Sequence, residues 1–114
     1  MTSTLGHRPD ARAGMRTLAE LLQPVETETP YGGRAVSYES FGVVWLATGD
    51  RRRRERTEDG AVRTVEAMTA ETRADPRLGE GRVLRFGGGD WAIAAIAAEA
   101  ASPGRVSLSL ERGR

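Results

Sequence analysis

The chain of 114 residues contains no cysteine, no lysine and a single histidine, His7. Without cysteine it cannot form a disulfide or a thiolate metal site, and one histidine offers little for a metal centre or a Ser-His-Asp arrangement. No apolar run approaches the ~20 residues of a membrane-spanning helix, and residues 1–14 lack the apolar stretch of a signal peptide. We therefore expect a protein that assembles or acts in the cytoplasm, with no metal, no cofactor and no membrane partner.

Enzymatic motifs are also missing. The run Gly87–Asp90 is rich in glycine, but a phosphate-binding P-loop needs a Gly-Lys-Ser/Thr sequence before a helix, and this chain has no lysine. We predict instead that these residues form a hairpin turn. The carboxylates are numerous but scattered, and no pair is set apart for acid–base catalysis. The sequence offers no catalytic site, and we expect a protein that is not an enzyme.

Basic and acidic residues are nearly balanced, with 17 arginines against 16 acidic residues and a net charge of +1. A dedicated nucleic-acid-binding protein usually has a clear basic excess, so the overall charge does not indicate one. We interpret the absence of lysine first as a bias of the coding sequence. Arginine nevertheless binds carboxylates and phosphates through a planar fork of donors, so the local clusters of arginine still matter.

The most distinctive cluster consists of Arg51, Arg52, Arg53, Arg54, Glu55 and Arg56. It lies within residues 48–61, which contain no large apolar side chain, so we predict a long exposed loop there. One interpretation is a solvated loop whose arginines pair with Glu55, Glu58 and Asp59. The other is contact with DNA phosphates, or with acidic patches of a neighbouring subunit, through binding that weakens steeply with salt.

Short alternating segments separated by glycine and proline turns predict β-strands. The turn signal at residues 30–33 should join residues 18–27 to residues 34–47 as a hairpin, with Gly42 marking a bulge. Further strands are expected at 62–73, whose mixed faces are typical of an edge strand or an arm that touches a neighbour, and at 82–86, 91–97 and 106–110. The expected fold class is mainly β, a small antiparallel β-barrel or sandwich of five to six strands with a long charged loop.

The chain is expected to divide into a flexible N-terminal arm, residues 1–14, and a single β-barrel domain, residues 15–114. Residues 15–25 fit helical and strand spacing alike, and we choose a strand because Pro24 would end a helix. The large aromatic residues are expected to be core or interface anchors, and a core position is preferred for both tryptophans. These anchors are Trp45, Trp91, Phe41 and Tyr38.

A set of short motifs follows in a fixed order along residues 15–112. They are Met15-Arg16, Gln23 to Thr27, Tyr31-Gly32-Gly33, Tyr38, Val44 to Ala47, Glu55, Thr69 to Arg73, Asp75-Pro76, Gly81-Arg82-Val83, Gly87-Gly88, Trp91, Ile93 and Val106 to Arg112. Each is a turn or strand signal and is weak alone. Their shared order and spacing resemble the phage head–tail joining proteins, the family of head-closure or stopper connectors, including the counterparts in gene transfer agents.

This resemblance implies a ring of copies, expected to be hexameric, between the portal–adaptor ring and the tail terminator or tail tube protein. Such a ring retains or gates the packaged double-stranded DNA and docks the tail. By position, residues 49–61 match a loop that projects into the channel of related stoppers. The resemblance also implies a place in the bacterial cytoplasm during assembly and then in the neck of a phage or gene transfer agent particle.

Two other functions remain open from the sequence. The chain fits another connector ring of the same particle, either an adaptor, which is expected to be largely helical, or a tail terminator. It also fits a non-specific DNA-binding module that acts through Arg51–Arg56, in which case the free monomer should bind DNA in a salt-sensitive way.

Overall fold

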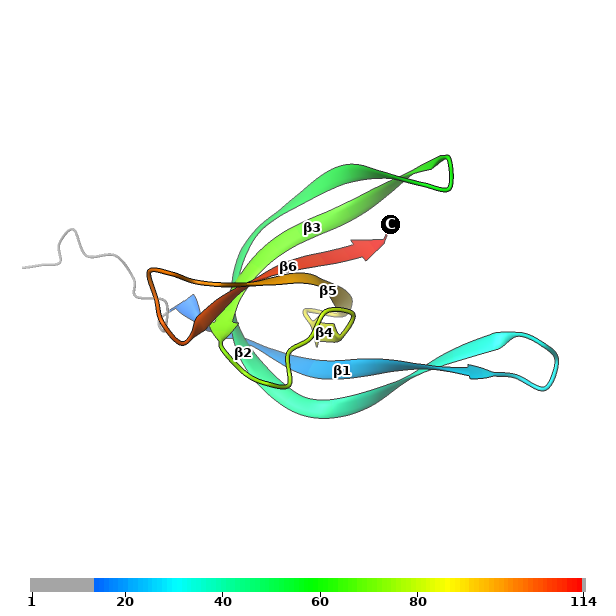
Figure 1. Ribbon diagram of the computed structural model, residues 1–114, viewed down its shortest axis with the longest axis horizontal. Coiled ribbons are helices and arrows are strands. Elements are labelled where there is room, and N and C mark those ends of the chain that lie inside the picture. Colours follow the sequence, from blue (N-terminus) through cyan, green and yellow to red (C-terminus); the bar gives the residue numbers. More distant parts are fainter. Residues whose placement is uncertain (1–13, 114) are drawn as a thin grey trace, which may run out of the picture.

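Six antiparallel strands close into one barrel, in a computed structural model that describes residues 14–113 (Figure 1). Around the barrel the strands follow the order β1-β2-β3-β6-β5-β4. This arrangement confirms the expected mainly β fold, whereas His7 and nearly all of the expected N-terminal arm, residues 1–14, lie outside the described residues. The strands are β1 (Thr17–Glu28), β2 (Arg34–Glu58), β3 (Ala61–Arg73), β4 (Val83–Phe86), β5 (Gly89–Ala98) and β6 (Arg105–Gly113).

The interior of the barrel is filled by apolar side chains that alternate along the strands. Trp91 lies among them and is completely buried, which confirms its expected core position. Alternation in β6 turns Leu108 and Leu110 inward and leaves Ser109 exposed, because successive side chains of a strand point to opposite faces. The other fully buried large side chains are Leu21, Leu46, Leu84 and Ile93.

Two long hairpins extend beyond the barrel. The first, here called the acidic arm (residues 23–40), begins where β1 leaves β4 after Leu22, and its turn lies at residues 29–33, as predicted. The second, here called the arginine arm (residues 51–65), ends where β3 begins to pair with β6 at Val65. Figure 1 shows both arms projecting to the same side of the barrel and diverging from each other.

β2 takes part in both arms, and two irregularities interrupt its pairing. At the first, Phe41 and Gly42 together lie opposite Leu21, so Gly42 marks a bulge as predicted, with a φ of 94° that strongly favours glycine. The second falls between Thr48 and Arg51. A Cβ on Gly49 would lie 2.7 Å from Thr69 Oγ1 and 3.2 Å from the Thr69 carbonyl oxygen, so the close approach of β2 to β3 favours glycine here.

Two sequence predictions about this region are wrong. Residues 48–61 are not a loop, because β2 continues through the arginine run to Glu58 and a tight turn at Asp59 and Gly60 leads into β3. The edge-strand alternative for residues 62–73 is wrong as well, since β3 pairs with β2 on one side and, from Val65 onward, with β6 on the other. The other alternative, a hairpin arm, is what β3 forms with β2, and its contact with a neighbour stays a prediction. Only the tip of β3 keeps an open edge.

A latch between the loop after β3 and the bulge of β2 gives a prediction of pH dependence. Arg77 donates hydrogen bonds to the carbonyl of Phe41 at 2.7 Å and to a carboxylate oxygen of Asp75 at 2.7 Å. The Arg77 side chain lowers the pKa of Asp75 below its ordinary value of 3.8. A carboxylate whose pKa is lowered by folding stabilises the folded state when the pH is above its ordinary pKa. This stabilisation is lost as the pH falls through the pKa of the folded state. We therefore expect Asp75→Asn to lower the free energy of unfolding at pH 6.

The same variant should differ less from the wild type at pH 3, which lies below the ordinary value of 3.8, because the unfolded wild-type chain takes up the proton at Asp75 there. Urea denaturation of both proteins at the two pH values measures the difference. An equal loss at pH 6 and pH 3 would mean that the Asp75 charge does not contribute to the latch.

Candidate interaction surface around the arginine arm

The strand register divides the arginine run between two faces of the arm. Arg51 lies opposite Met68, and Arg53 lies opposite Glu66, so these two arginines share the face that continues the barrel interior. The remaining arginines of the run point to the outer face, because side chains alternate along a strand. These are Arg52, Arg54 and Arg56.

The inner face closes the barrel around Trp91. The Arg51 guanidinium lies 5.6 Å from the centre of the indole ring, and the Arg112 guanidinium lies 4.6 Å from it. Arg112 also donates a hydrogen bond to Glu66 at 2.8 Å, and the Glu66 side chain is mostly buried. Arg51 therefore has a structural role in stabilising the core through a cation–π contact.

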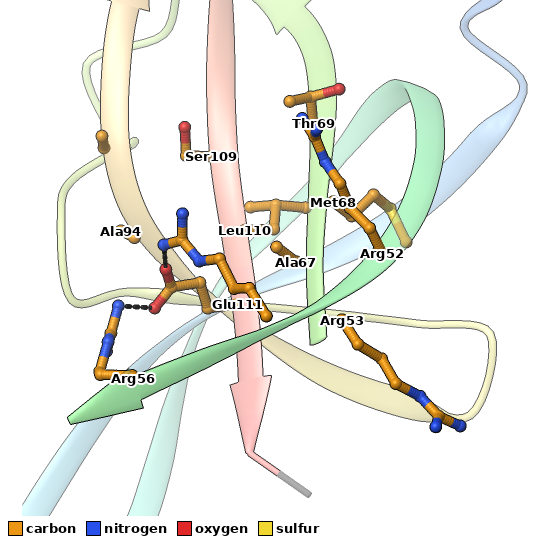
Figure 2. Close-up of a pocket in the computed structure, with 12 residues that line it drawn as sticks. Arg52, Arg53, Arg56, Ala67, Met68, Thr69, Ala94, Ser109, Leu110 and Glu111 are labelled. Carbon is orange, nitrogen blue, oxygen red and sulfur yellow. Dashed lines mark hydrogen bonds and ion pairs between the residues drawn. The ribbon is translucent and has the colours of Figure 1, made fainter. Parts of the chain in front are cut away.

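The outer face borders a groove of about 660 Å³. Figure 2 shows Arg52 extending along β3 toward Thr69, Arg56 directed at Glu111, and Arg53 directed away from the groove. The arginines form one wall, and the floor consists of small residues on β3, β6 and β5. These are Ala67, Thr69, Ser109, Ala94 and Ala95.

Glu111 neutralises part of this wall. Its side chain is largely buried and accepts hydrogen bonds from the guanidinium groups of Arg54 and Arg56. Figure 2 shows the bond from Arg56. Sequence reasoning assigned the arginines to nearby acids, but among the residues 14–113 only Glu58 of those acids reaches one, 3.9 Å from Arg56. Glu111 was missed because it is 55 residues from Arg56 in the chain, and only the pairing of β3 with β6 brings it close.

Positive charge remains on the arm after this pairing. Arg52 and Arg53 have no carboxylate within ion-pair distance in the part of the chain that the structure describes. Arg56 lies directly opposite Arg63 on the same face, and like charges in that position destabilise a strand pair. An anion bound at the arm would relieve this repulsion, so the surface has the chemistry expected for phosphates or for a carboxylate-rich partner.

Replacing Glu111 with glutamine tests the charge balance of the arm. We expect a loss of about 1–2 kcal/mol in the free energy of unfolding, because two partly exposed arginines lose a charged acceptor. The same change removes one negative charge beside the arm, so any binding to DNA at low salt should become tighter. Urea denaturation and fluorescence anisotropy with a labelled duplex measure the two effects. Weaker DNA binding by a folded Glu111→Gln protein would count against an anion site here.

The other candidate residues occupy different places. The prediction that Trp45 belongs to the core is wrong, since 54% of its surface is exposed, and Tyr38 is 44% exposed. Phe41 is half-buried against the core beneath Arg82, whose guanidinium lies 4.3 Å from the ring centre. The role of Trp45 and Tyr38 as interface anchors, which requires a partner, therefore stays a prediction. Both residues lie on a different surface from the arginine arm.

Sites for a metal or a membrane do not emerge from the described part of the chain. Within residues 14–113 no three carboxylate or histidine side chains gather closely enough to hold a metal ion. Among those same residues, no helix has the length and apolar character needed to cross a bilayer.

The fold and this surface define a class: a small closed β-barrel with two long hairpin arms, one of them rich in arginine. A solved structure of the virion of a native gene transfer agent particle contains a chain of similar fold. The two chains share 22% sequence identity with a TM-score of 0.61, and the match covers 87% of this chain and 96% of the other. At this identity the likeness establishes the shared fold alone. No protein-family model and no curated protein sequence matches the chain.

Proposed function

We propose that this chain is a structural subunit of a phage-like or gene transfer agent particle, and within it a head–tail connector of the stopper or head-closure type. The observation that carries the proposal is the fold match to a chain of a gene transfer agent virion, which extends over 96% of that chain. The order of motifs along residues 15–112 supports the same assignment independently, because it depends on turn and strand signals and not on the superposition.

In this proposal, copies of the chain form a ring between the portal–adaptor ring and the tail terminator or tail tube protein. The arginine arm faces the channel and contacts the phosphates of the packaged double-stranded DNA. Arg52 and Arg53 suit this role because neither has a carboxylate within ion-pair distance among the described residues. Contacts to phosphates do not depend on the base sequence. This independence suits a protein that must accept every DNA sequence packaged in the particle.

Two other roles in the same particle can be compared with the fold. An adaptor ring is expected to be largely helical, and the described residues form a β-barrel. A tail terminator remains compatible with a β fold. A free DNA-binding module is favoured by one observation, the arginines without carboxylate partners, and it predicts DNA binding by the isolated monomer at low salt.

Electron microscopy of tailless particles tests the connector proposal. Particles assembled without this protein should carry a portal–adaptor vertex to which purified protein binds as an added ring. They should then accept tails and retain their DNA. If the purified protein binds along the tail or at its far end, the chain is a different component of the particle. If it binds nowhere on the particle, a structural role is refuted.

A further inference from the structure

The outer surface of the barrel carries an apolar patch that the fold does not cover. Leu18 and Trp45 are direct cross-strand neighbours, and Val43 is paired with Glu20 in the next outward position. The three apolar side chains are 47%, 54% and 51% exposed, respectively. We call Leu18, Val43 and Trp45 the tryptophan patch. Apolar side chains that cluster on one exposed face, and do not lie singly, form a surface that a partner can cover.

A second surface on the barrel has the opposite shape. The floor of the groove includes a continuous row of small exposed residues, because Thr69 pairs with Ser109 and Ser109 pairs with Ala95. A row of small side chains between arginine side chains leaves a hollow that a large planar ring can enter. Arginine also stacks well on tryptophan, so Arg54 and Arg56, which Glu111 holds at the edge of the groove, suit an indole ring.

The two surfaces lie on opposite sides of the barrel. The tryptophan patch is on β1 and β2, and the row of Thr69, Ser109 and Ala95 runs across β3, β6 and β5 with β6 at its centre. In the closed strand order, β3 separates β2 from β6, and β4 separates β1 from β5. A subunit with complementary surfaces on opposite sides joins its neighbours head to tail, and such a heterologous contact can close into a ring.

Charge complementarity favours another copy of this chain as the occupant of the groove. Beside Val43 lies Glu20, which is opposite Arg85 of β4, and Arg85 in turn pairs with Asp90, so these three residues together have a net charge of −1. The groove is bordered by Arg52, Arg54 and Arg56 around Glu111, a net charge of +2. The same contrast holds for the arms. The acidic arm has three glutamates and one arginine, a net charge of −2, and the arginine arm has six arginines against three acidic residues, a net charge of +3.

We propose that the tryptophan patch of one copy docks into the groove of the next copy, with Trp45 seated on the row formed by Thr69, Ser109 and Ala95. This inference rests on the ring of the proposed function and names the two faces that build it. It also accounts for the exposure of Trp45, which no contact within residues 14–113 removes.

Paired cysteines test which faces meet, because the chain contains no cysteine of its own. In the double variant Val43→Cys/Ala95→Cys, a flexible bis-maleimide should link one copy to the next and give a ladder beyond the dimer. Each single variant should give no linked product, because like faces do not meet. The reaction is run on the free protein at high concentration and on protein bound to tailless particles.

Several outcomes would overturn the proposal. Linked dimers from Val43→Cys alone would mean that the patch meets itself in a two-fold contact. Absence of a ladder from the double variant in both samples would mean that another partner covers the patch. A ladder without binding to particles would refute the connector role and support the interface. Binding to particles without a ladder would support the connector role and refute the interface.

Trp45→Ala provides the energetic test of the same contact, with Tyr31→Ala as the matched control. Tyr31 is 97% exposed at the turn of the acidic arm and lies outside both faces. We expect Trp45→Ala to weaken self-association at least about 10-fold, as for an aromatic hot spot, and Tyr31→Ala to leave it unchanged. Sedimentation and ring counts on particles measure association. Equal behaviour of the two variants would contradict a docked Trp45.

Discussion

Replacing Trp91 with alanine is expected to lower the free energy of unfolding by about 3–5 kcal/mol. The indole is completely buried, stacks on Phe86 with 6.3 Å between ring centres, and lies beneath the guanidinium groups of Arg51 and Arg112. Truncation removes these contacts together and leaves a cavity in a narrow barrel. For a chain of this length the midpoint of thermal unfolding should fall by at least about 10 °C, measured by circular dichroism.

Trp45→Ala is the matched control for this experiment, because it removes the same side chain from the outer surface of the same barrel. Its 54% exposure predicts a loss below about 1 kcal/mol in the monomer. If Trp91→Ala does not fold, Trp91→Phe keeps a ring over the core and should show an intermediate loss of about 1–3 kcal/mol. Similar losses for the two alanine variants would contradict the assignment of Trp91 to the core and Trp45 to the surface.

The different outcomes for the two tryptophans show where strand periodicity stops being informative. In residues 43–46 every side chain is apolar, so both phases of the alternation predict a buried face. The structure selects Val44 and Leu46 for the interior and leaves Val43 and Trp45 outside. Around Trp91 the flanking residues are Asp90 and Ala92, and the pattern therefore allowed only one large residue to point inward.

The turns were predictable because their chemistry is local. The glycines at residues 32–33 and 87–89 permit tight hairpin turns, and the strands on either side follow directly. The arginine arm was not predictable in this way. A run without large apolar side chains resembles a loop, and it forms a strand here because β3 supplies a hydrogen-bonding partner along its whole length. Pairing over a long hairpin thus overrides a composition that disfavours strands.

The candidate site was predictable in its composition and not in its geometry. The sequence identifies the arginine run, but the separation into two faces depends on the bulge between Thr48 and Arg51, which sets the phase of everything after it. That phase turns Arg51 toward Trp91 and Arg54 toward Glu111. Neither partner is close in sequence. The strand register is therefore needed to separate the arginines that stabilise the fold from those that remain free to bind a partner.

Arg52→Ala/Arg53→Ala is expected to produce the largest change in binding to DNA. If each side chain contacts one phosphate, the double variant loses two contacts, and the slope of log affinity against log salt becomes shallower by about 1.8. The electrostatic contribution vanishes near 1 M salt, so the affinity should fall about 200-fold at 50 mM and about 20-fold at 200 mM. Fluorescence anisotropy with a labelled duplex, repeated across a salt series, measures both quantities.

The control must remove the same charge without touching the arm. Arg34→Ala/Arg73→Ala also removes two exposed arginines, one from the acidic arm and one from the end of β3 where that strand leaves the barrel. If binding depends on the arginine arm, this variant should keep the wild-type slope apart from a small change due to net charge. Equal slopes for the two double variants would mean that DNA responds only to net charge. The arm would then be assigned to contacts between protein subunits, for which the groove and its buried Glu111 already supply the chemistry.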